Sequence, residues 1–328
     1  MAAVKSVEIV SAGLQTTIQD LGRFGYGRYG VPPSGALDSF SLRIANRLVD
    51  NSEKSACLEI TLMGLQLKAL TDVCLAVTGA DLQSKVNHQP LQMWRSHVLH
   101  KGDTLSFIGP RSGCRAYIAF SGGIVTPLVL GSRSTNLSSG FGGIEGRSLQ
   151  RGDYLFTESP QAGLSMAGRL FKPRWIPKYP SVWTLRAVWG PQDEDFTNKG
   201  RRTFSHTVYR VSSQSDRTGI RLDGAEIQKK NDRAESIISE GLISGSIQVP
   251  GDGQPIIILG ETVTGGYRKI ATVISADLHV LGQIKPGDGV QFAIISLEEA
   301  QRALAELESK IRTGCSDSQE GLPEHVTF

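Results

Sequence analysis

Residues 245–255 read Gly-Ser-Ile-Gln-Val-Pro-Gly-Asp-Gly-Gln-Pro and lead directly into the apolar segment 256–259. A second polar stretch, residues 212–222, precedes this one, and a third, residues 264–269, follows it. Glycine lets the backbone turn and approach a ligand closely, while Gln, Ser, Asp, Arg and Lys side chains supply hydrogen-bond donors and acceptors. Tight turns between strands use the same residue types, so any single stretch fits a turn as well as a site. The occurrence of three such stretches in one region favours a ligand-binding site over three separate turns.

Most of the chain consists of short apolar segments separated by turn residues, a pattern typical of a β-rich sandwich or barrel. The clearest strand candidates are residues 73–78, 114–120, 183–188, 256–259, 271–274 and 290–295. A Gly-Asp pair precedes alternating apolar residues at Gly102-Asp103, Gly152-Asp153 and Gly287-Asp288. Each pair is expected to form a turn that leads into a strand. The predicted fold class is mainly β with some α.

Two segments have the periodicity of amphipathic helices. Asp38 is a candidate N-cap for a helix that runs to about Val49. The apolar face of this helix is formed by Phe40, Ile44, Ala45 and Leu48. Ser296-Leu297-Glu298-Glu299 has the pattern of a capping box, and the helix that it begins is expected to reach about Arg312.

Four prolines fall between residues 159 and 180, at 160, 173, 177 and 180. Proline restricts its own φ and disfavours helix in the residue before it, so we expect a domain boundary near residue 170. The predicted organisation is an α+β domain over residues 1–170 and a β-barrel domain with a C-terminal helix over residues 171–312. Residues 313–328 are polar and are expected to form a flexible tail.

Composition excludes several classes of protein. The chain has 35 Lys and Arg against 32 Asp and Glu, a net charge of +3, which calls for no nucleic-acid partner. No apolar run approaches the roughly 20 residues that cross a bilayer, and the N-terminus has no signal-peptide core. We therefore expect a cytoplasmic protein without a membrane partner. The four cysteines lack C-x-x-C spacing and the six histidines form no ligand pattern, which indicates free thiols and no metal.

Nucleotide and cofactor motifs are also missing. The glycine-rich segment 140–146 lacks G-x-G-x-x-G spacing, and no G-x-x-x-x-G-K-[ST] sequence occurs. None of the four methionines is followed by lysine, so this chain has no Met-Lys-Met biotin attachment site.

The best acid–base candidates are Asp216, Glu240, Asp252 and Lys269, and the predicted catalytic residues are Asp216, Glu240 and Lys269. A catalytic role requires pKa values that burial or neighbouring charges have shifted, and Glu240 also fits the end of a strand. Further candidates for substrate binding in this half are Gln214, Arg217, Gln248, Gln254 and Tyr267. The glutamine amides suit an amide or ureido group because each offers both a donor and an acceptor.

Arg23 and Arg133 are the substrate-binding candidates in the first half. A guanidinium can clamp a carboxylate or phosphate through two parallel hydrogen bonds. The alternative is that each arginine pairs with a local carboxylate such as Asp20 or Glu145. Both interpretations stay open from sequence.

Residues 10–23, Val-Ser-Ala-Gly-Leu-Gln-Thr-Thr-Ile-Gln-Asp-Leu-Gly-Arg, resemble the opening of the allophanate-hydrolase-subunit-2 family. Its members include the C subunit of 5-oxoprolinase, the KipA-type proteins and part of the carboxyltransferase region of urea carboxylase. Matching motifs continue at residues 58–61, 78–81, 131–135, 214–217 and 247–250. The resemblance covers about residues 7–296 in order, and its motifs are specific in combination.

This resemblance implies a cyclophilin-like β-barrel in the C-terminal half. It also implies a partner, the KipI-like protein (allophanate hydrolase subunit 1), which is the B subunit in 5-oxoprolinase. In the 5-oxoprolinase system these two proteins and a third, the A subunit, open 5-oxo-L-proline to L-glutamate with ATP. The implied activity is that of a hydrolase component that works only with its partners. Because no nucleotide motif is present, the ATP site is unassigned.

Two alternatives remain beside that function. One is a biotin-dependent carboxyl transfer of the urea-carboxylase type, which forms allophanate and needs a separate biotin carrier. The other is a KipA-type regulatory binding role without turnover. For the leading function, Arg217 or Arg133 would hold the substrate carboxylate and glutamine amides the lactam. Arg217→Ala and Gln248→Ala are then expected to abolish turnover with little change in melting.

Overall fold

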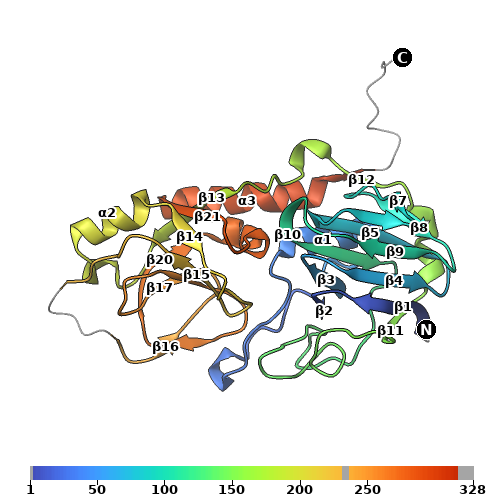
Figure 1. The fold of residues 1–328 in the computed structure, drawn as a ribbon, viewed down its shortest axis with the longest axis horizontal. Helices are drawn as coiled ribbons and strands as arrows, with labels where there is room; N and C mark the ends of the chain where they lie inside the picture. Colours follow the sequence, from blue (N-terminus) through green and yellow to red (C-terminus); the bar gives the residue numbers. More distant parts are fainter. Residues whose placement is uncertain (1–2, 231–235, 317–328) are drawn as a thin grey trace, which may run out of the picture. The chain divides into compact units, whose positions relative to one another are not determined.

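The computed structural model describes residues 3–230 and 236–316, which divide into two compact units (Figure 1). The first unit consists of residues up to Gly22, Asp38–Tyr179 and the residues from Glu308 on. The second, which we call the barrel unit, consists of Arg23–Leu37 and Pro180–Leu307. The division follows Tyr179 and not residue 170, because residues 170–179 pack within the first unit. Trp175, for example, has its ring centroid 6.4 Å from that of Phe171.

Two β-sheets form most of the first unit. One has the strand order β11-β1-β4-β9-β6-β7 and the other the order β2-β3-β10-β5-β8. The first comprises β1 (Val4–Ala12), β4 (Leu65–Ala69), β6 (Ser84–Val86), β7 (Gln89–Pro90), β9 (Thr104–Phe107) and β11 (Tyr154–Thr157). The second comprises β2 (Gln15–Gln19), β3 (Cys57–Thr61), β5 (Val73–Asp81), β8 (Ser96–Leu99) and β10 (Ser112–Phe120). Alternate residues of both sheets, such as Ile9, Leu67 and Ile118, are fully buried in one core.

Helix α1 (Ser39–Leu48) covers β5 and β10 in this unit. Asp38 caps it, because its Oδ1 accepts a hydrogen bond from Ser41 N at 2.9 Å. The expected apolar face, Phe40, Ile44, Ala45 and Leu48, is buried. The predicted helix and the orientation of its apolar face are therefore both confirmed. Burial of each large apolar side chain contributes about 1.5–3 kcal/mol to the stability of the fold.

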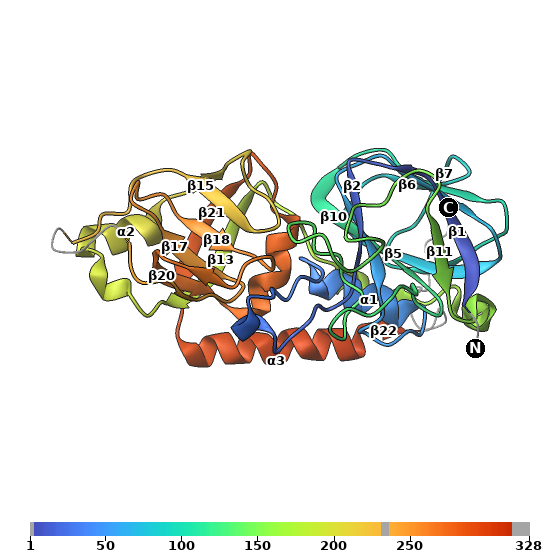
Figure 2. The ribbon, with the colours of Figure 1, turned by 90° about the horizontal axis from the view of Figure 1, so that it is seen from below.

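Seven strands close a barrel within the described part of the barrel unit, in the order β13-β20-β17-β18-β15-β14-β21 (Figure 2). These are β13 (Val182–Trp189), β14 (Tyr209–Val211), β15 (Gly219–Asp223), β17 (Ser246–Val249), β18 (Ile256–Ile258), β20 (Arg268–Val273) and β21 (Gly289–Ile294). Alternation points Trp183, Leu185 and Ala187 of β13 inward. The expected C-terminal barrel and the mainly β fold class are confirmed.

Two helices accompany the barrel. Phe204 of α2 (Asn198–His206) stacks on Phe292 with ring centroids 4.4 Å apart. Helix α3 (Leu297–Thr313) begins at the predicted capping box, in which Ser296 Oγ accepts from Glu299 N at 3.2 Å. Glu299 Oε2 accepts from Ser296 N at 2.8 Å in return. The division between the two units falls inside α3.

The first residues of the expected flexible tail form secondary structure. Strand β22 (Cys315–Ser316) pairs antiparallel with β12 (Leu170–Phe171). Gly314 makes this possible, since a Cβ there would overlap the ring of Phe171. Upstream, Arg43 of α1 forms an ion pair with Glu308 of α3 at 2.6 Å. The rest of the predicted tail, residues 317–328, lies outside the described residues.

The remaining elements are short. They are the pair β16 (Glu240–Gly241) and β19 (Thr264–Gly265), and the 3-10 helices η1 (Gly27–Tyr29), η2 (Pro160–Met166), η3 (Pro173–Trp175), η4 (Asp193–Asp195) and η5 (Ser275–Gln283). Among residues 3–230 and 236–316, no helix has the length and apolar character to span a membrane. All four cysteines are free thiols, as expected.

Candidate functional site

A carboxylate, an ammonium and an amide meet in the barrel unit. Lys269 Nζ lies 2.7 Å from Glu240 Oε1, and Gln192 Nε2 donates to the same oxygen at 2.8 Å. Gln192 Oε1 in turn accepts from Lys269 N at 3.0 Å. The side chain of Lys269 is 10% exposed and that of Glu240 is 39% exposed, so the carboxylate is the accessible partner of a largely buried ammonium.

Strand pairing brings these groups together from distant parts of the chain. Gln248 of β17 is the register partner of Lys269 of β20, next to an irregularity in the pairing. Glu240 of β16 is the partner of Gly265 of β19. A Cβ on Gly265 would lie 2.6 Å from Gln248 Nε2, so glycine at this position leaves room for the buried amide. Bulges and close-approach glycines are common beside active sites.

Gln248 and Tyr267 complete the group that we call the Glu240–Lys269 cluster, with Gln192, Glu240 and Lys269. Gln248 is 4% exposed, and its Nε2 donates to Tyr267 O at 3.1 Å. The Tyr267 side chain is exposed. The structure thus assembles four of the residues predicted from sequence, and it adds Gln192, which sequence reasoning missed. The Gly190-Pro191-Gln192 run directly after β13 was the available signal.

The pKa of Glu240 is lowered from its ordinary value, mainly by the hydrogen bond from Lys269 and further by the Gln192 amide. The carboxylate is therefore charged at neutral pH and is a hydrogen-bond acceptor. The cluster combines an acceptor, a cationic donor and two neutral amides, which together can bind a small molecule that carries an amide and a carboxylate.

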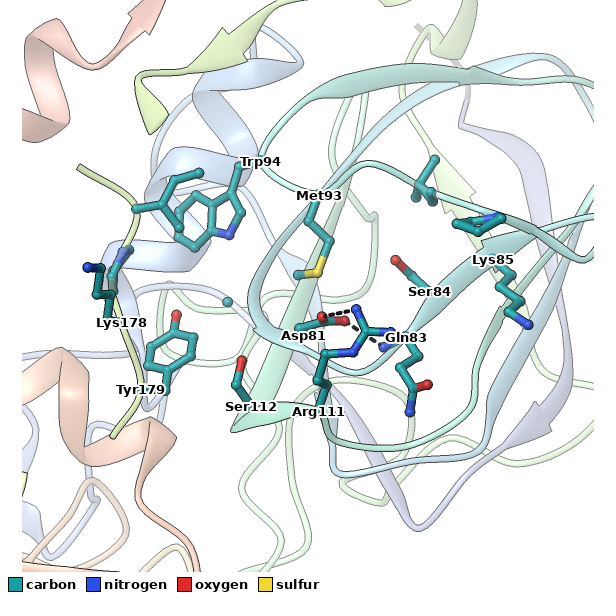
Figure 3. A pocket seen from close by; sticks show the side chains of 15 residues that line it. Asp81, Gln83, Ser84, Lys85, Met93, Trp94, Arg111, Ser112, Lys178 and Tyr179 are labelled. Atoms are coloured by element: carbon teal, nitrogen blue, oxygen red, sulfur yellow. Dashed lines mark hydrogen bonds and ion pairs between the residues drawn. The ribbon is translucent and has the colours of Figure 1, made fainter. Parts of the chain in front are cut away.

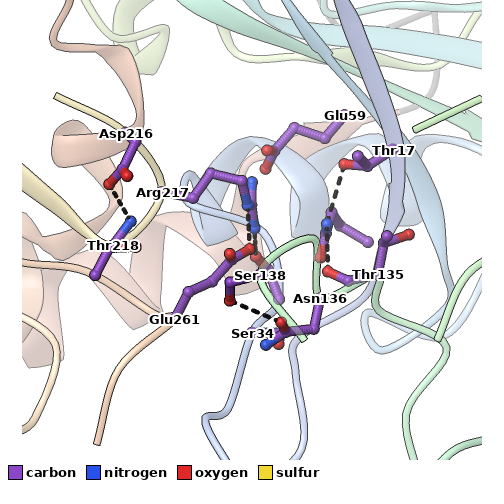
Figure 4. A network of polar contacts seen from close by, with 12 residues as sticks. Thr17, Ser34, Glu59, Thr135, Asn136, Ser138, Asp216, Arg217, Thr218 and Glu261 are labelled. Atoms are coloured by element: carbon purple, nitrogen blue, oxygen red, sulfur yellow. Dashed lines mark hydrogen bonds and ion pairs between the residues drawn. The ribbon is translucent and has the colours of Figure 1, made fainter. Parts of the chain in front are cut away.

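Arg217 does not join this cluster. Its Nε donates to Glu261 Oε1 at 2.6 Å and its Nη2 to Gly35 O at 2.8 Å (Figure 4). Arg217 is 5% exposed and Glu261 is 8% exposed. Arg23 is buried as well, and its Nη1 donates to Ser34 Oγ at 2.9 Å. Both arginines make internal contacts to residues of the segment Arg23–Leu37, and the substrate-binding role expected for them stays a prediction.

Three other predicted residues belong to turns. Asp216 Oδ1 accepts from Thr218 N at 2.7 Å and from Gly219 N at 3.1 Å (Figure 4). Both amide-group atoms of Gln254 bond to the backbone of Gly224, at 2.8 and 3.2 Å. Gln214 is exposed. The turn interpretation of these polar stretches therefore describes the contacts of all three residues better than the site interpretation.

Asp20 organises a buried polar loop in the first unit, a role that sequence reasoning missed. Its carboxylate accepts from Ser132 Oγ at 2.6 Å, Ser134 Oγ at 2.5 Å, Arg133 N at 2.6 Å and Gly22 N at 2.8 Å. Arg133 is thus held through its backbone and not through a guanidinium–Asp20 pair. Glu145, the other expected partner, binds Arg147 at 3.1 Å.

We expect Asp20→Asn to lower the free energy of unfolding by about 1–3 kcal/mol. Asparagine has one acceptor oxygen and a donor NH₂, so at least one of the four donors would lose its acceptor inside the protein. Urea denaturation measures the loss. Asp223→Asn, on an exposed side chain of β15, is the control and should leave the midpoint unchanged. An equally unchanged midpoint for Asp20→Asn would remove Asp20 as the organising group.

The described residues contain no group of three or more His, Cys, Asp or Glu side chains suited to a metal ion. The histidine of β8, His97, contacts the backbone: its Nε2 lies 2.7 Å from Gln92 O. Burial lowers the pKa of His97, so its ring is neutral at neutral pH.

Comparison with known proteins relates this chain to one family of carboxyltransferase domains. The family described as carboxyltransferase domain, subdomain A and B, matches residues 29–294. The C subunit of 5-oxoprolinase from Escherichia coli K12 is 38% identical over 298 residues, which are 90% of this chain and 94% of that protein. The urea amidolyase of Lachancea kluyveri is 35% identical over 325 residues, 93% of this chain but 18% of that protein. The crystal structure of the K. lactis urea amidolyase matches with a TM-score of 0.89 and 32% identity, over 99% of this chain and 21% of that chain.

Proposed function

Because the chain belongs to the carboxyltransferase family of subdomains A and B, we propose that it is the C subunit of an ATP-dependent 5-oxoprolinase. In this function it acts with the A and B subunits to convert 5-oxo-L-proline to L-glutamate. The observation that carries the proposal is the match to the E. coli C subunit, which spans 94% of that protein at 38% identity.

The Glu240–Lys269 cluster suits this substrate. 5-Oxo-L-proline is a cyclic amide that bears a carboxylate. Lys269 supplies a cation for the carboxylate, and the Gln192 and Gln248 amides supply donors and acceptors for the lactam. Both Arg217 and Lys269 are ion-paired, with Glu261 at 2.6 Å and Glu240 at 2.7 Å. The Glu261 side chain is 3% exposed and that of Glu240 is 39% exposed, so the proposal gives the substrate carboxylate to Lys269, the cation whose partner is accessible.

ATP enters this function as a second substrate. Phosphorylation of the lactam oxygen would create a leaving group that plain hydrolysis lacks. Since this chain carries no nucleotide-binding motif, we assign the ATP site to the partner proteins or to a surface shared with them. Glu240 then remains the acid–base candidate in this chain, as the accessible carboxylate of the cluster.

Reconstitution tests the proposal. The chain is combined with the A and B subunits, and ADP release is measured with and without 5-oxo-L-proline. We expect substrate-dependent release only in the complete mixture. Equal ADP release when this chain is omitted would contradict the proposal.

A biotin-dependent carboxyl transfer is the second candidate. It is favoured by the match to the K. lactis urea amidolyase over 99% of this chain. This function requires a biotinylated carrier on another chain. Co-purification of such a carrier, detected with labelled streptavidin, together with urea-dependent ATP consumption, would support it over the 5-oxoprolinase function.

A further inference from the structure

The first unit contains a cavity of about 730 Å³ to which the Glu240–Lys269 cluster contributes no residue. Its walls come from β5, β6, the segment 90–94, the start of β10 and residues 176–179 (Figure 3). Small-molecule sites in proteins enclose about 300–1,000 Å³, so the cavity has the size of a ligand site.

One wall of the cavity is apolar and held in a strained conformation. Trp94 has a φ of +60° and Gln83 a φ of +56°, in the left-handed region that bulky residues rarely adopt. The Trp94 backbone is fixed on both sides, by a bond to Val77 O at 2.7 Å and one from Phe171 N at 2.9 Å. Strained residues that the surrounding structure fixes in this way cluster at ligand sites. The Met93 thioether points into the same space (Figure 3).

Ser84 adds a polar group that lacks a partner. Its Oγ has no hydrogen-bond partner among the described residues, and the residue is 4% exposed. Met93, which lines the same cavity, carries an adaptable thioether that can move aside. A buried hydroxyl without a partner destabilises a protein, and a ligand atom that reached it would remove that cost.

The charges around the cavity favour an anion. Arg111 Nη1 lies 3.1 Å from Asp81 Oδ2, so these two charges compensate each other. Lys85 and Lys178 also line the cavity, and neither forms an ion pair with a described residue. Two uncompensated positive charges raise the local concentration of anions.

We propose that this cavity binds a small organic anion with an apolar body and a carboxylate or phosphate group. The body contacts Met93 and Trp94, and the anionic group is attracted by Lys85 and Lys178. The proposal goes beyond the 5-oxoprolinase function and does not rest on it, because the cavity shares no residue with the Glu240–Lys269 cluster.

Isothermal titration of the full chain with four naphthalene probes tests the proposal. The probes share one apolar body and differ in charge: 2-naphthoate, 2-naphthyl phosphate, 2-naphthylmethanol and 2-naphthylmethylamine. We expect at least one anion to bind about fivefold or more tightly than the alcohol, with the amine weakest. The tighter of the two anions identifies the head group. Equal affinity for all four probes would overturn the proposal.

Variants place the binding in the cavity. Lys85→Met with Lys178→Met should weaken the anion about tenfold and leave the alcohol unchanged. Lys68→Met, at an exposed position of β4, is the matched control and should change neither. Ser84→Ala should weaken binding without lowering the melting temperature, because it deletes a hydroxyl that has no partner. An anion affinity that survives the double lysine variant would show that the probe binds elsewhere, which contradicts the proposal.

Discussion

Replacing Arg217 by alanine is expected to lower the free energy of unfolding by about 3–5 kcal/mol. Arg217 is 5% exposed and donates to Glu261 at 2.6 Å and to Gly35 O at 2.8 Å. Its removal leaves a buried carboxylate without its guanidinium and a carbonyl without this donor, and both are costly in a low-dielectric interior. Urea denaturation followed by circular dichroism measures the change. Arg221→Ala, on an exposed side chain of β15, is the matched control and should cost less than about 0.5 kcal/mol.

A double-mutant cycle separates the ion pair from packing. The variant Arg217→Ala with Glu261→Ala is expected to be less destabilised than the sum of its single variants, because it removes both charges of the pair together. Additive losses would mean that the two side chains stabilise the barrel unit independently. A melting curve unmoved by Arg217→Ala would restore the substrate-binding role predicted from sequence.

The helices and the strands were predictable because their signals are local. The Asp38 cap and the Ser296–Glu299 capping box each join residues three apart, and strand alternation repeats every second residue. The strand pairing at the start of the predicted tail was not predictable. It depends on the contact between Gly314 and Phe171, which lie far apart in sequence.

The sequence predicted the region of the Glu240–Lys269 cluster, but it did not predict which residues form the cluster. Glu240, Gln248 and Lys269 all fall within the polar stretches or the strand end noted from sequence, and strand register unites them. Arg217 occupies the same polar stretches and has an equally suitable side chain. Its contacts with Glu261 and Gly35, which lie 44 and 182 positions away, show that the guanidinium makes internal contacts. Residue type and spacing therefore indicate where polar groups gather, while long-range packing decides which of them stay accessible.

Lys269→Met is expected to lower kcat/KM for 5-oxo-L-proline in the reconstituted enzyme by about a hundredfold or more. Methionine keeps the length of the apolar stem and removes the ammonium that lies 2.7 Å from Glu240. Because a cation for the substrate carboxylate acts mainly in binding, the loss should appear chiefly as a higher KM. ADP release at a series of substrate concentrations measures both constants. Lys199→Met, at an exposed position of α2, is the control and should match the wild type.

Glu240→Gln tests the acid–base role of Glu240 separately from the binding role of Lys269. The amide retains an acceptor for Lys269 and Gln192 but cannot exchange a proton at neutral pH, so kcat should fall about a hundredfold while KM changes little. Since the Glu240 side chain is 39% exposed, the variant should melt within a few degrees of the wild type, as surface substitutions do. If both Lys269→Met and Glu240→Gln keep kcat and KM within about threefold of the wild type, the cluster is structural and the chemistry must be assigned to a partner protein.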